Sequence, residues 1–221
     1  MEIVFLGAKN PETLRMIRAI GRTDPDFRVR GFLDNDPARH GTFEGYPVFG
    51  GIDALTDEMI ASCRFVNLIT GSTRARYETS REMARRGCRF ANFVHPSVDL
   101  DLTEIGTGNY LQEQVIVQAG AKIGNNSSVH IAALVAHEVT IGHSVFVAHA
   151  VSLSGEVVVE DGVFIGTNAT VVPRVRIGRW STIGAGSVVL KDVPPYSVAV
   201  GNPAKILRTV EPIHDSGDPL R

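Results

Sequence analysis

The second half of the chain places an aliphatic residue at every sixth position. Stepping by six from Ile105 to Val189 gives fifteen positions, and all of them are Ile, Leu or Val. The thirteen between these two ends are Leu111, Val117, Ile123, Val129, Val135, Ile141, Val147, Leu153, Val159, Ile165, Val171, Ile177 and Ile183. A fixed period of this kind indicates stacked structural repeats.

A second set of positions, four residues after the aliphatic ones, has small or β-branched side chains. It consists of Val115, Ala121, Ser127, Ala133, Val139, Val145, Val151, Val157, Val163, Ala169, Val175, Ser181 and Ser187. Each hexad supplies one short strand and one turn, and three hexads return the chain above itself, so eighteen residues make one triangular coil. At that spacing Gly106, Gly124, Gly142 and Gly178 share one corner, and Glu160 takes the fifth place there. We expect these glycines to serve as permissive turn residues.

The first ninety residues show no six-residue period. Short apolar runs alternate with segments of helical spacing, which predicts a small parallel sheet with right-handed crossovers. Strands are expected at 3–6, 29–33, 65–69 and 90–94, and helices at 12–20 and 77–86. We therefore divide the chain into an α/β domain at 1–93, a repeat domain at 94–210 and a flexible tail at 211–221.

Charge and hydropathy narrow the choice of partners. The formal net charge is -2, from 22 basic and 24 acidic residues, and this gives no field that attracts nucleic acid or an anionic membrane. The first apolar run is too short for a signal peptide, and no stretch approaches the roughly 20 apolar residues of a membrane span. We expect a cytoplasmic protein that binds small molecules.

The hexads and the segment at 196–205, Tyr-Ser-Val-Ala-Val-Gly-Asn-Pro-Ala-Lys, resemble the hexapeptide-repeat acyltransferases. An α/β half followed by the repeat is similar to the nucleotide-sugar N-acetyltransferases and the sialic acid O-acetyltransferase family. The resemblance implies a small Rossmann-like parallel sheet followed by a left-handed parallel β-helix. It also implies a homotrimer, acetyl-CoA as cosubstrate, and a cytoplasmic enzyme of polysaccharide biosynthesis.

The resemblance places the general base at His137, followed by Glu138. Attack on a thioester requires the loss of a proton, which imidazole accepts near neutral pH, and the carboxylate stabilises the imidazolium that forms. Gly155 stacks one coil above His137, and by the same analogy its N–H is an oxyanion donor. His137, His143 and His149 are six residues apart, so they lie on three different faces and cannot form a metal site within one subunit. No metal is expected.

Two groups of binding residues follow from the resemblance by position. Acetyl-CoA is expected to contact Phe146, Thr167 and Ala185, with Lys205 near its phosphates. Phe146 replaces a polar residue of close relatives, which leaves it a stacking or packing role. The acceptor is expected at the ends of the predicted strands, where helix N-termini and carboxylates bind diphosphates and nucleosides. Its residues are Gly7, Ala8, Lys9, Asp34, Asn35 and Gly71.

The resemblance and the residues that carry it imply acetyl transfer from acetyl-CoA to an amino group of a nucleotide-linked amino sugar, a 4-amino deoxysugar above all. Only one glycine follows the first strand, where relatives have several, and this supports O-acetylation of a free sialic-acid-like sugar as an alternative. An alternative of another class is a non-catalytic β-helix that acts as a binding or scaffold protein. A zinc hydratase, with histidines meeting between subunits, is the third.

Overall fold

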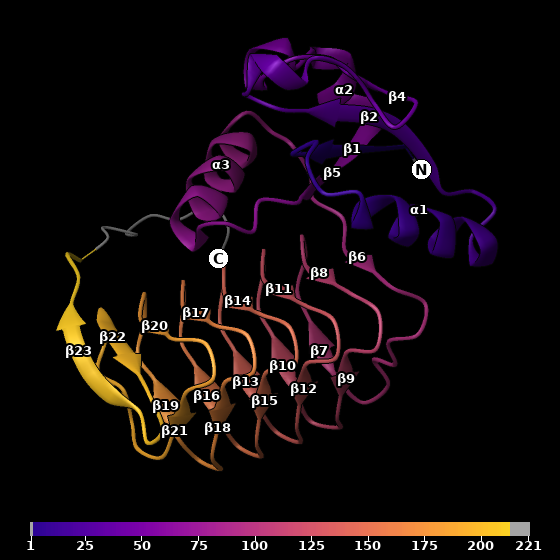
Figure 1. The fold of residues 1–221 in the computed structure, drawn as a ribbon. Coiled ribbons are helices and arrows are strands. Elements are labelled where there is room, and N and C mark those ends of the chain that lie inside the picture. The colour runs from indigo at the N-terminus through magenta and orange to yellow at the C-terminus, as the bar shows by residue number, and fades with distance from the viewer. Residues whose placement is uncertain (1, 213–221) are drawn as a thin grey trace.

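The computed structural model describes residues 2–212, and the predicted tail at 211–221 falls almost entirely outside them. The N-terminal half holds a five-stranded sheet in the order β3-β4-β2-β1-β5 (Figure 1). The four strands β4, β2, β1 and β5 run parallel, and β3 pairs antiparallel with β4 at one edge. The strands are β1 (Glu2–Leu6), β2 (Arg28–Leu33), β3 (Gly41–Phe43), β4 (Tyr46–Val48) and β5 (Cys63–Asn67). The helices are α1 (Glu12–Thr23), α2 (Asp57–Ser62), α3 (Thr73–Arg85) and the 3-10 turns η1 (Pro37–Arg39) and η2 (Ile52–Ala54).

The predicted strand at 90–94 is wrong as a single element. Phe90 makes an isolated parallel bridge to Phe65 of the N-terminal sheet. Phe93 and Val94 instead form β6, which pairs with β8 of the β-helix. The segment therefore joins the two halves, and its apolar residues are divided between two sheets. The other predicted strands and helices are confirmed to within a few residues at each end.

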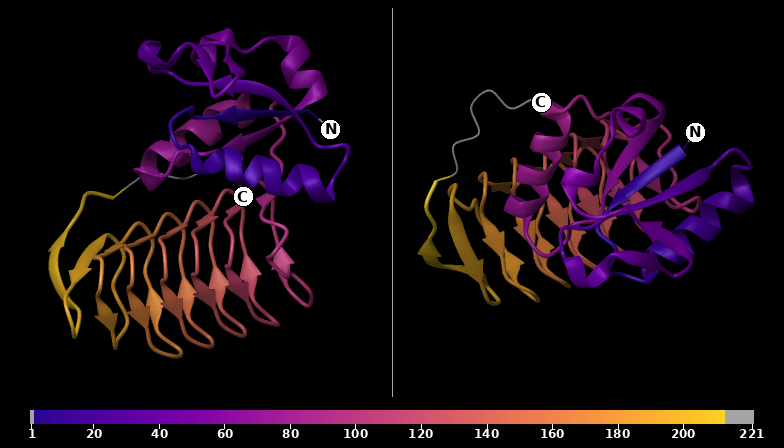
Figure 2. Two further views of the ribbon diagram at one scale, coloured as in Figure 1. Left: turned by 45° about the vertical axis from the view of Figure 1, so that its right-hand side comes forward. Right: turned by 90° about the horizontal axis from the view of Figure 1, so that it is seen from above.

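The second half is a β-helix whose short strands, most of them of two residues, stack into three flat faces (Figures 1 and 2). We call them the covered, apolar and charged faces. The covered face has β6 (Phe93–Val94), β8 (Tyr110–Leu111), β11 (Ser128–Val129), β14 (Phe146–Val147), β17 (Phe164–Ile165), β20 (Thr182–Ile183), β22 (Ser197–Val200) and β23 (Lys205–Thr209). The apolar face has β9 (Ile116–Val117), β12 (Leu134–Val135), β15 (Ser152–Leu153), β18 (Thr170–Val171) and β21 (Val188–Val189). The charged face has β7 (Glu104–Ile105), β10 (Lys122–Ile123), β13 (Thr140–Ile141), β16 (Val158–Val159) and β19 (Arg176–Ile177).

The repeat positions form the interior of the β-helix, as predicted. Of the fifteen aliphatic positions, thirteen are buried, and the other two, Ile105 and Val117, lie partly buried in the first coil. All thirteen small or β-branched positions of the second set are buried as well. Each coil is joined to the next by backbone hydrogen bonds in a parallel register of eighteen residues, such as Val129 to Val147. Aliphatic side chains stacked in this way fill the interior and leave no channel.

The corner glycines have a different purpose from the one predicted. Gly124 and Gly142 do not have positive φ angles; the left-handed residues are two positions further on, at Asn126 (φ 58°) and Ser144 (φ 55°). A Cβ on Gly124 would lie 2.8 Å from the backbone of Gly142 in the next coil. Glycine is needed at this corner because successive coils pack against each other there without room for a side chain.

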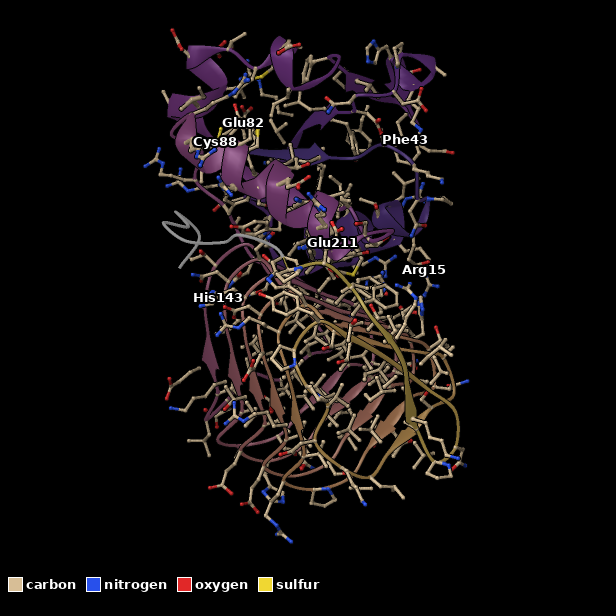
Figure 3. All side chains as sticks on the ribbon, turned by 90° about the vertical axis from the view of Figure 1, so that its left-hand side faces the viewer. Arg15, Phe43, Glu82, Cys88, His143 and Glu211 are labelled. Atoms are coloured by element: carbon tan, nitrogen blue, oxygen red, sulfur yellow. The ribbon has the colours of Figure 1, made fainter. Side chains whose placement is uncertain are left out.

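The N-terminal half sits on the covered face, with α1 and α3 turned toward the β-helix (Figures 1 and 2). Arg15 of α1 pairs with Glu113 at 2.7 Å, and Tyr77 of α3 packs edge-on against Trp180, with ring centroids 5.3 Å apart. Figure 3 shows Arg15 and His143 on opposite sides of the molecule, near the level where the halves meet. No helix within residues 2–212 is both long and apolar enough to span a membrane.

Candidate active site

A cavity of about 600 Å³ lies at the carboxyl ends of the parallel strands β1, β2 and β5. This is the edge at which open α/β sheets bind their ligands. Five of the six predicted acceptor residues line it, namely Gly7, Lys9, Asp34, Asn35 and Gly71. The sixth, Ala8, is buried behind them and donates its N–H to Asp34. The structure therefore brings the predicted acceptor residues together.

The carboxylate of Asp34 is already occupied by groups of its own chain. It accepts the N–H of Ala8 at 2.8 Å, the N–H of Asp36 at 2.9 Å and a guanidinium N–H of Arg39 at 3.0 Å. Burial would raise its pKa, but these three hydrogen bonds hold the pKa below its ordinary value. Of about four acceptor positions on a carboxylate, one remains for a ligand. Asp34 thus holds the turn after β1 in place, whatever it contributes to binding.

Cationic groups border the same cavity. Lys9 is exposed at the start of α1, beside Gly7, whose φ of 105° favours glycine. Arg39, in the 3-10 turn η1, was not among the predicted residues. It lies next to the predicted acidic segment, and its ion pairs with Asp34 and Asp36 hold it at the cavity wall. Lys9 therefore offers the cavity a positive charge for an anionic ligand such as a diphosphate, whereas the two carboxylates already balance the charge of Arg39.

His137, Glu138 and Gly155 form a compact group at one corner of the β-helix. His137 Nδ1 lies 3.3 Å from Glu138 Oε2, and Gly155 is packed directly against the other side of the ring. A Cβ on Gly155 would overlap the imidazole at Nε2 and Cε1. Among the described residues nothing accepts the N–H of Gly155, whereas the N–H of His137 is bound by Gln118 Oε1 at 3.0 Å. A free imidazole nitrogen and a free backbone donor therefore lie side by side.

His143 and His149 occupy other corners. His143 Nδ1 accepts the backbone N–H of Asn125 at 3.0 Å, and the backbone N–H of His143 donates to Asp161 Oδ1 at 2.8 Å. His143 thus belongs to a series of hydrogen bonds that join successive coils at this corner, and its role is structural. His149 is exposed, with its ring 5.0 Å from that of His130.

His130 is a buried histidine on the covered face. Its Nε2 lies 2.9 Å from Ser128 Oγ, and its Nδ1 has no partner among the residues described. Burial, with smaller contributions from His149 and Arg76, lowers its pKa to about 3, so the ring is neutral at physiological pH. Phe146 packs on it at 4.5 Å between centroids.

His130 is expected to make the fold sensitive to acid. Below pH 6.5 the unfolded chain binds a proton on this residue, while the folded chain binds it only near pH 3. The free energy of unfolding should therefore fall by about 1.4 kcal/mol per pH unit through that range on account of this residue. Urea unfolding at pH 7 and pH 5 measures it, and His130→Phe should reduce the loss between the two by about 2 kcal/mol. Equal losses in both proteins would contradict the assignment.

The predicted cofactor residues are distributed over the covered face and its border with the apolar face. Thr167 and Ala185 lie in consecutive turns after β17 and β20. These two turns pack closely against each other, since a Cβ on Gly166 would lie 2.6 Å from Ala185 N. Phe146 is 6% exposed and stacks on Phe164 at 4.8 Å, so it packs within the covered face. Lys205 is exposed in β23.

The structure does not bring His137 to the cavity or to these cofactor residues. His137 lies in the turn between β12 and β13, which joins the apolar face to the charged face. The N-terminal half is attached at the two other corners, through Arg15 to Glu113 and Arg76 to Asn126. Within one chain His137 and the cavity are therefore on opposite sides of the β-helix.

A metal site finds no support in the side chains described. Among residues 2–212 there is no group of three or more His, Cys, Asp or Glu side chains arranged to hold an ion. The three histidines spaced by six residues were predicted on three different faces; they lie apart, in the turns at three separate corners between the faces. A zinc centre would need ligands from more than one chain.

Known proteins share both the repeat and the two-part architecture. A family model described as bacterial transferase hexapeptide (six repeats) matches residues 156–191. PerB from Caulobacter crescentus, crystallised with CoA and GDP-perosamine, is 30% identical with a TM-score of 0.83, and the match covers 93% of this chain and 97% of that one. WeeI from Acinetobacter baumannii is 27% identical with a TM-score of 0.80, covering 94% of this chain and 100% of that one.

The matches to curated sequences are shorter. Serine acetyltransferase 3 of Arabidopsis thaliana is 43% identical over 120 residues, which are 53% of this chain and 27% of that protein. The chain spans about a quarter of the length of the curated relatives it matches. Together, the left-handed β-helix of hexads and the full-length match define the class of protein. The chain belongs to the hexapeptide-repeat acyltransferase family. Over nearly its whole length it is similar to sugar N-acetyltransferases of that family, such as the perosamine enzyme of C. crescentus.

Proposed function

We propose that this protein transfers acetyl from acetyl-CoA to an amino group of a nucleotide-linked amino sugar, in particular a 4-amino deoxysugar. The observation that supports it most is the packing of Gly155 on the His137 imidazole, with the N–H of Gly155 unoccupied among the described residues. We assign to that N–H the binding of the thioester oxygen as negative charge develops there. The acceptor amine attacks directly, and no acyl-enzyme is formed.

His137 acts as the general base in this mechanism. Glu138 lies on the Nδ1 side of the ring, so a proton on Nδ1 is directed at the carboxylate and Nε2 is left to receive the proton of the amine. Glu138 has a φ of 58°, a left-handed conformation that places it at the corner beside His137. The carboxylate then stabilises the imidazolium. As the amide forms, the C–S bond of the thioester breaks, and the CoA thiolate that leaves takes up the proton from His137.

The cavity at the carboxyl ends of β1, β2 and β5 is the proposed acceptor site. The diphosphate lies near Gly7 and Lys9 at the start of α1, and the nucleoside lies toward Asp34 and Asn35. Arg39 is added to this set from the structure. PerB was crystallised with a nucleotide-linked sugar and CoA together, which supports both ligands for a chain of the same architecture.

Acetyl-CoA is proposed to lie along the β-helix, between the turns with Thr167 and Ala185 and the corner of a neighbouring chain. Lys205 in the exposed strand β23 would meet its phosphates. Phe146 contributes packing to this region, because its ring is stacked on Phe164 and also contacts the tilted ring of His130.

The proposed site is complete only in an oligomer, for which we propose a homotrimer. One chain keeps His137 and the acceptor cavity apart, so the cavity of one chain must serve the His137 of another. The differences between the three faces support the apolar face as the surface of association. The N-terminal half occupies the covered face, and ion pairs such as Glu104 with Lys122 line the charged face. The apolar face exposes uncharged residues that include Ile116, Leu134, Val172, Val188 and Leu190.

Sedimentation equilibrium tests this arrangement. The expected mass of the wild type is about 72 kDa, three times 23.9 kDa. Leu134→Arg on the apolar face is expected to give single chains with less than about a hundredth of the activity, because a charge cannot be buried unpaired in an interface. Thr140→Arg on the charged face is the matched control and should remain trimeric and active. A monomeric wild type that retains full activity would contradict the shared site.

The reaction itself is tested by thioester cleavage of acetyl-CoA with a panel of nucleotide-linked amino sugars and free sugar acids. Turnover of a nucleotide-linked 4-amino sugar is the expected result. Turnover of only a sialic-acid-like sugar would replace N-acetylation by O-acetylation. Silence across the panel, together with no acetyl-CoA binding by calorimetry, would favour the scaffold alternative.

A further inference from the structure

Arg76 is a fully buried charge at the junction of the two halves. Its guanidinium donates to four backbone carbonyl oxygens: Asn67 at 2.6 Å, Ile69 at 3.3 Å, Asn126 at 2.8 Å and Gly108 at 3.3 Å. The first two belong to the N-terminal half, and the last two belong to successive coils of the β-helix. A single side chain of α3 thus ties both halves together.

This contact requires the guanidinium group of an arginine. No carboxylate pairs with Arg76 among the described residues, and burial lowers its pKa to about 9, which leaves it protonated at neutral pH. A buried cation without a counter-ion is tolerated only when its donors are satisfied. The planar fork of the guanidinium therefore fixes where these four carbonyls lie, which an apolar side chain of equal size would not do.

The carbonyls on the N-terminal side belong to the loop that lines the acceptor cavity. Asn67 and Ile69 flank Leu68, and the cavity wall continues through Thr70 and Gly71. The side chain of Asn67 closes the same loop by accepting the N–H of Ile69 at 2.8 Å. The hydrogen bonds of Arg76 therefore fix the position of this loop relative to the β-helix.

Helix α3 also contacts the cavity. Thr79 and Met83 line the cavity from one side of the helix, while Ser80 donates to Asn126 Oδ1 of the β-helix at 2.8 Å. Asn67 in turn donates to Ser80 Oγ at 2.8 Å. These uncharged hydrogen bonds thus form a second connection, beside the contacts of Arg76, between the cavity and the same corner of the β-helix.

We propose that Arg76 is a positioning residue for the acceptor: it sets the loop at 68–71 against the β-helix, and with it the direction in which a bound nucleotide sugar leaves the cavity. Arg76 is 0% exposed, so it acts through the loop and does not touch the ligand. This role rests on the proposed function, in which the cavity is the acceptor site.

The test compares full-length wild type with Arg76→Lys, which keeps the charge and loses the fork. KM for the nucleotide sugar is expected to rise about tenfold, while KM for acetyl-CoA stays within about twofold. Amide hydrogen exchange at 68–71 should be at least about tenfold faster, with the strands β15 to β18 unchanged. Arg85→Lys, an exposed arginine of the same helix, is the control and should match the wild type.

The results of this test distinguish the positioning role of Arg76 from the proposed function on which it rests. A loss of kcat with both KM values unchanged, or unchanged exchange at 68–71, would mean that Arg76 only holds the fold together, and this would overturn the positioning role. If Arg76→Lys does not fold, Ser80→Ala breaks the parallel contact and should show the same selective rise in KM at smaller size; a uniform effect there overturns the role too. Failure of the wild type to bind any nucleotide sugar would instead overturn the proposed function on which the role rests.

Discussion

His137→Ala is expected to lower kcat about a thousandfold, because it removes the group that we propose takes the proton from the attacking amine. KM for both substrates should change little, since the ring is 58% exposed and holds no other part of the chain in place. Steady-state kinetics on the purified protein measure the effect. Glu138→Gln, which keeps the hydrogen bond and removes the charge, should cost about tenfold.

His143→Ala is the control for that experiment. Its ring nitrogen accepts a backbone N–H at another corner, so the variant is expected to lose stability and to keep the activity of its folded fraction. Full activity in His137→Ala would remove this residue from the mechanism. The search for a base would then move to His149, the exposed histidine beside the covered face.

Gly155→Ala is expected to lower kcat about a hundredfold while the melting temperature stays close to that of the wild type. The added methyl would overlap His137 at Nε2 and Cε1, so the ring must move by about 1 Å, and a displacement of that size costs about a hundredfold in rate. The ring is exposed and free to move, and Gly155 has no positive φ angle, so the fold itself is not strained.

Gly124→Ala is the matched control in the β-helix. Its Cβ would meet the backbone of Gly142 at 2.8 Å, and the backbone cannot move away as a side chain can. This variant should therefore melt earlier and keep its rate per folded molecule. If Gly155→Ala behaves in the same way, the packing of Gly155 on His137 has only a structural purpose.

The β-helix could be predicted from the sequence because one physical requirement recurs every six residues. An aliphatic side chain must fill the interior at each strand, and the fifteen positions from Ile105 to Val189 meet that requirement without an insertion. The reason for the corner glycines could not be predicted, because it depends on the distance between coils. Left-handed turns are made instead by residues such as Gln114, Ala132 and Arg174, which give no sequence signal of positive φ.

The N-terminal half was predicted less completely. The strand ends that line the cavity follow from apolar runs that stop at Leu6 and Leu33. The hairpin of β3 and β4 has three-residue strands, too short for a period to show. Arg39 and Arg76 were not predicted because their roles come from contacts made after folding, with Asp34 in one case and with distant backbone carbonyls in the other.

The candidate site could be predicted by type of residue but not by location. Spacing placed His137 and Gly155 in one column, and the structure has them in contact. Spacing could not show that the N-terminal half rests on the covered face, opposite this column. That depends on α1 and α3 meeting the turns near Glu113 and Asn126. These contacts, and not the repeat, are what make a second chain necessary for the proposed site.

The packing of α3 on Trp180 has a practical consequence. Trp180 is the one tryptophan in the chain, and it is 6% exposed beneath the ring of Tyr77. Its emission spectrum therefore reports a single place, the seam between the two halves. Separation of the halves would expose the indole to water and shift its fluorescence to the red, even if every coil of the β-helix stayed intact. The protein thus has a built-in optical signal for the motion of one half against the other, with no label to be attached.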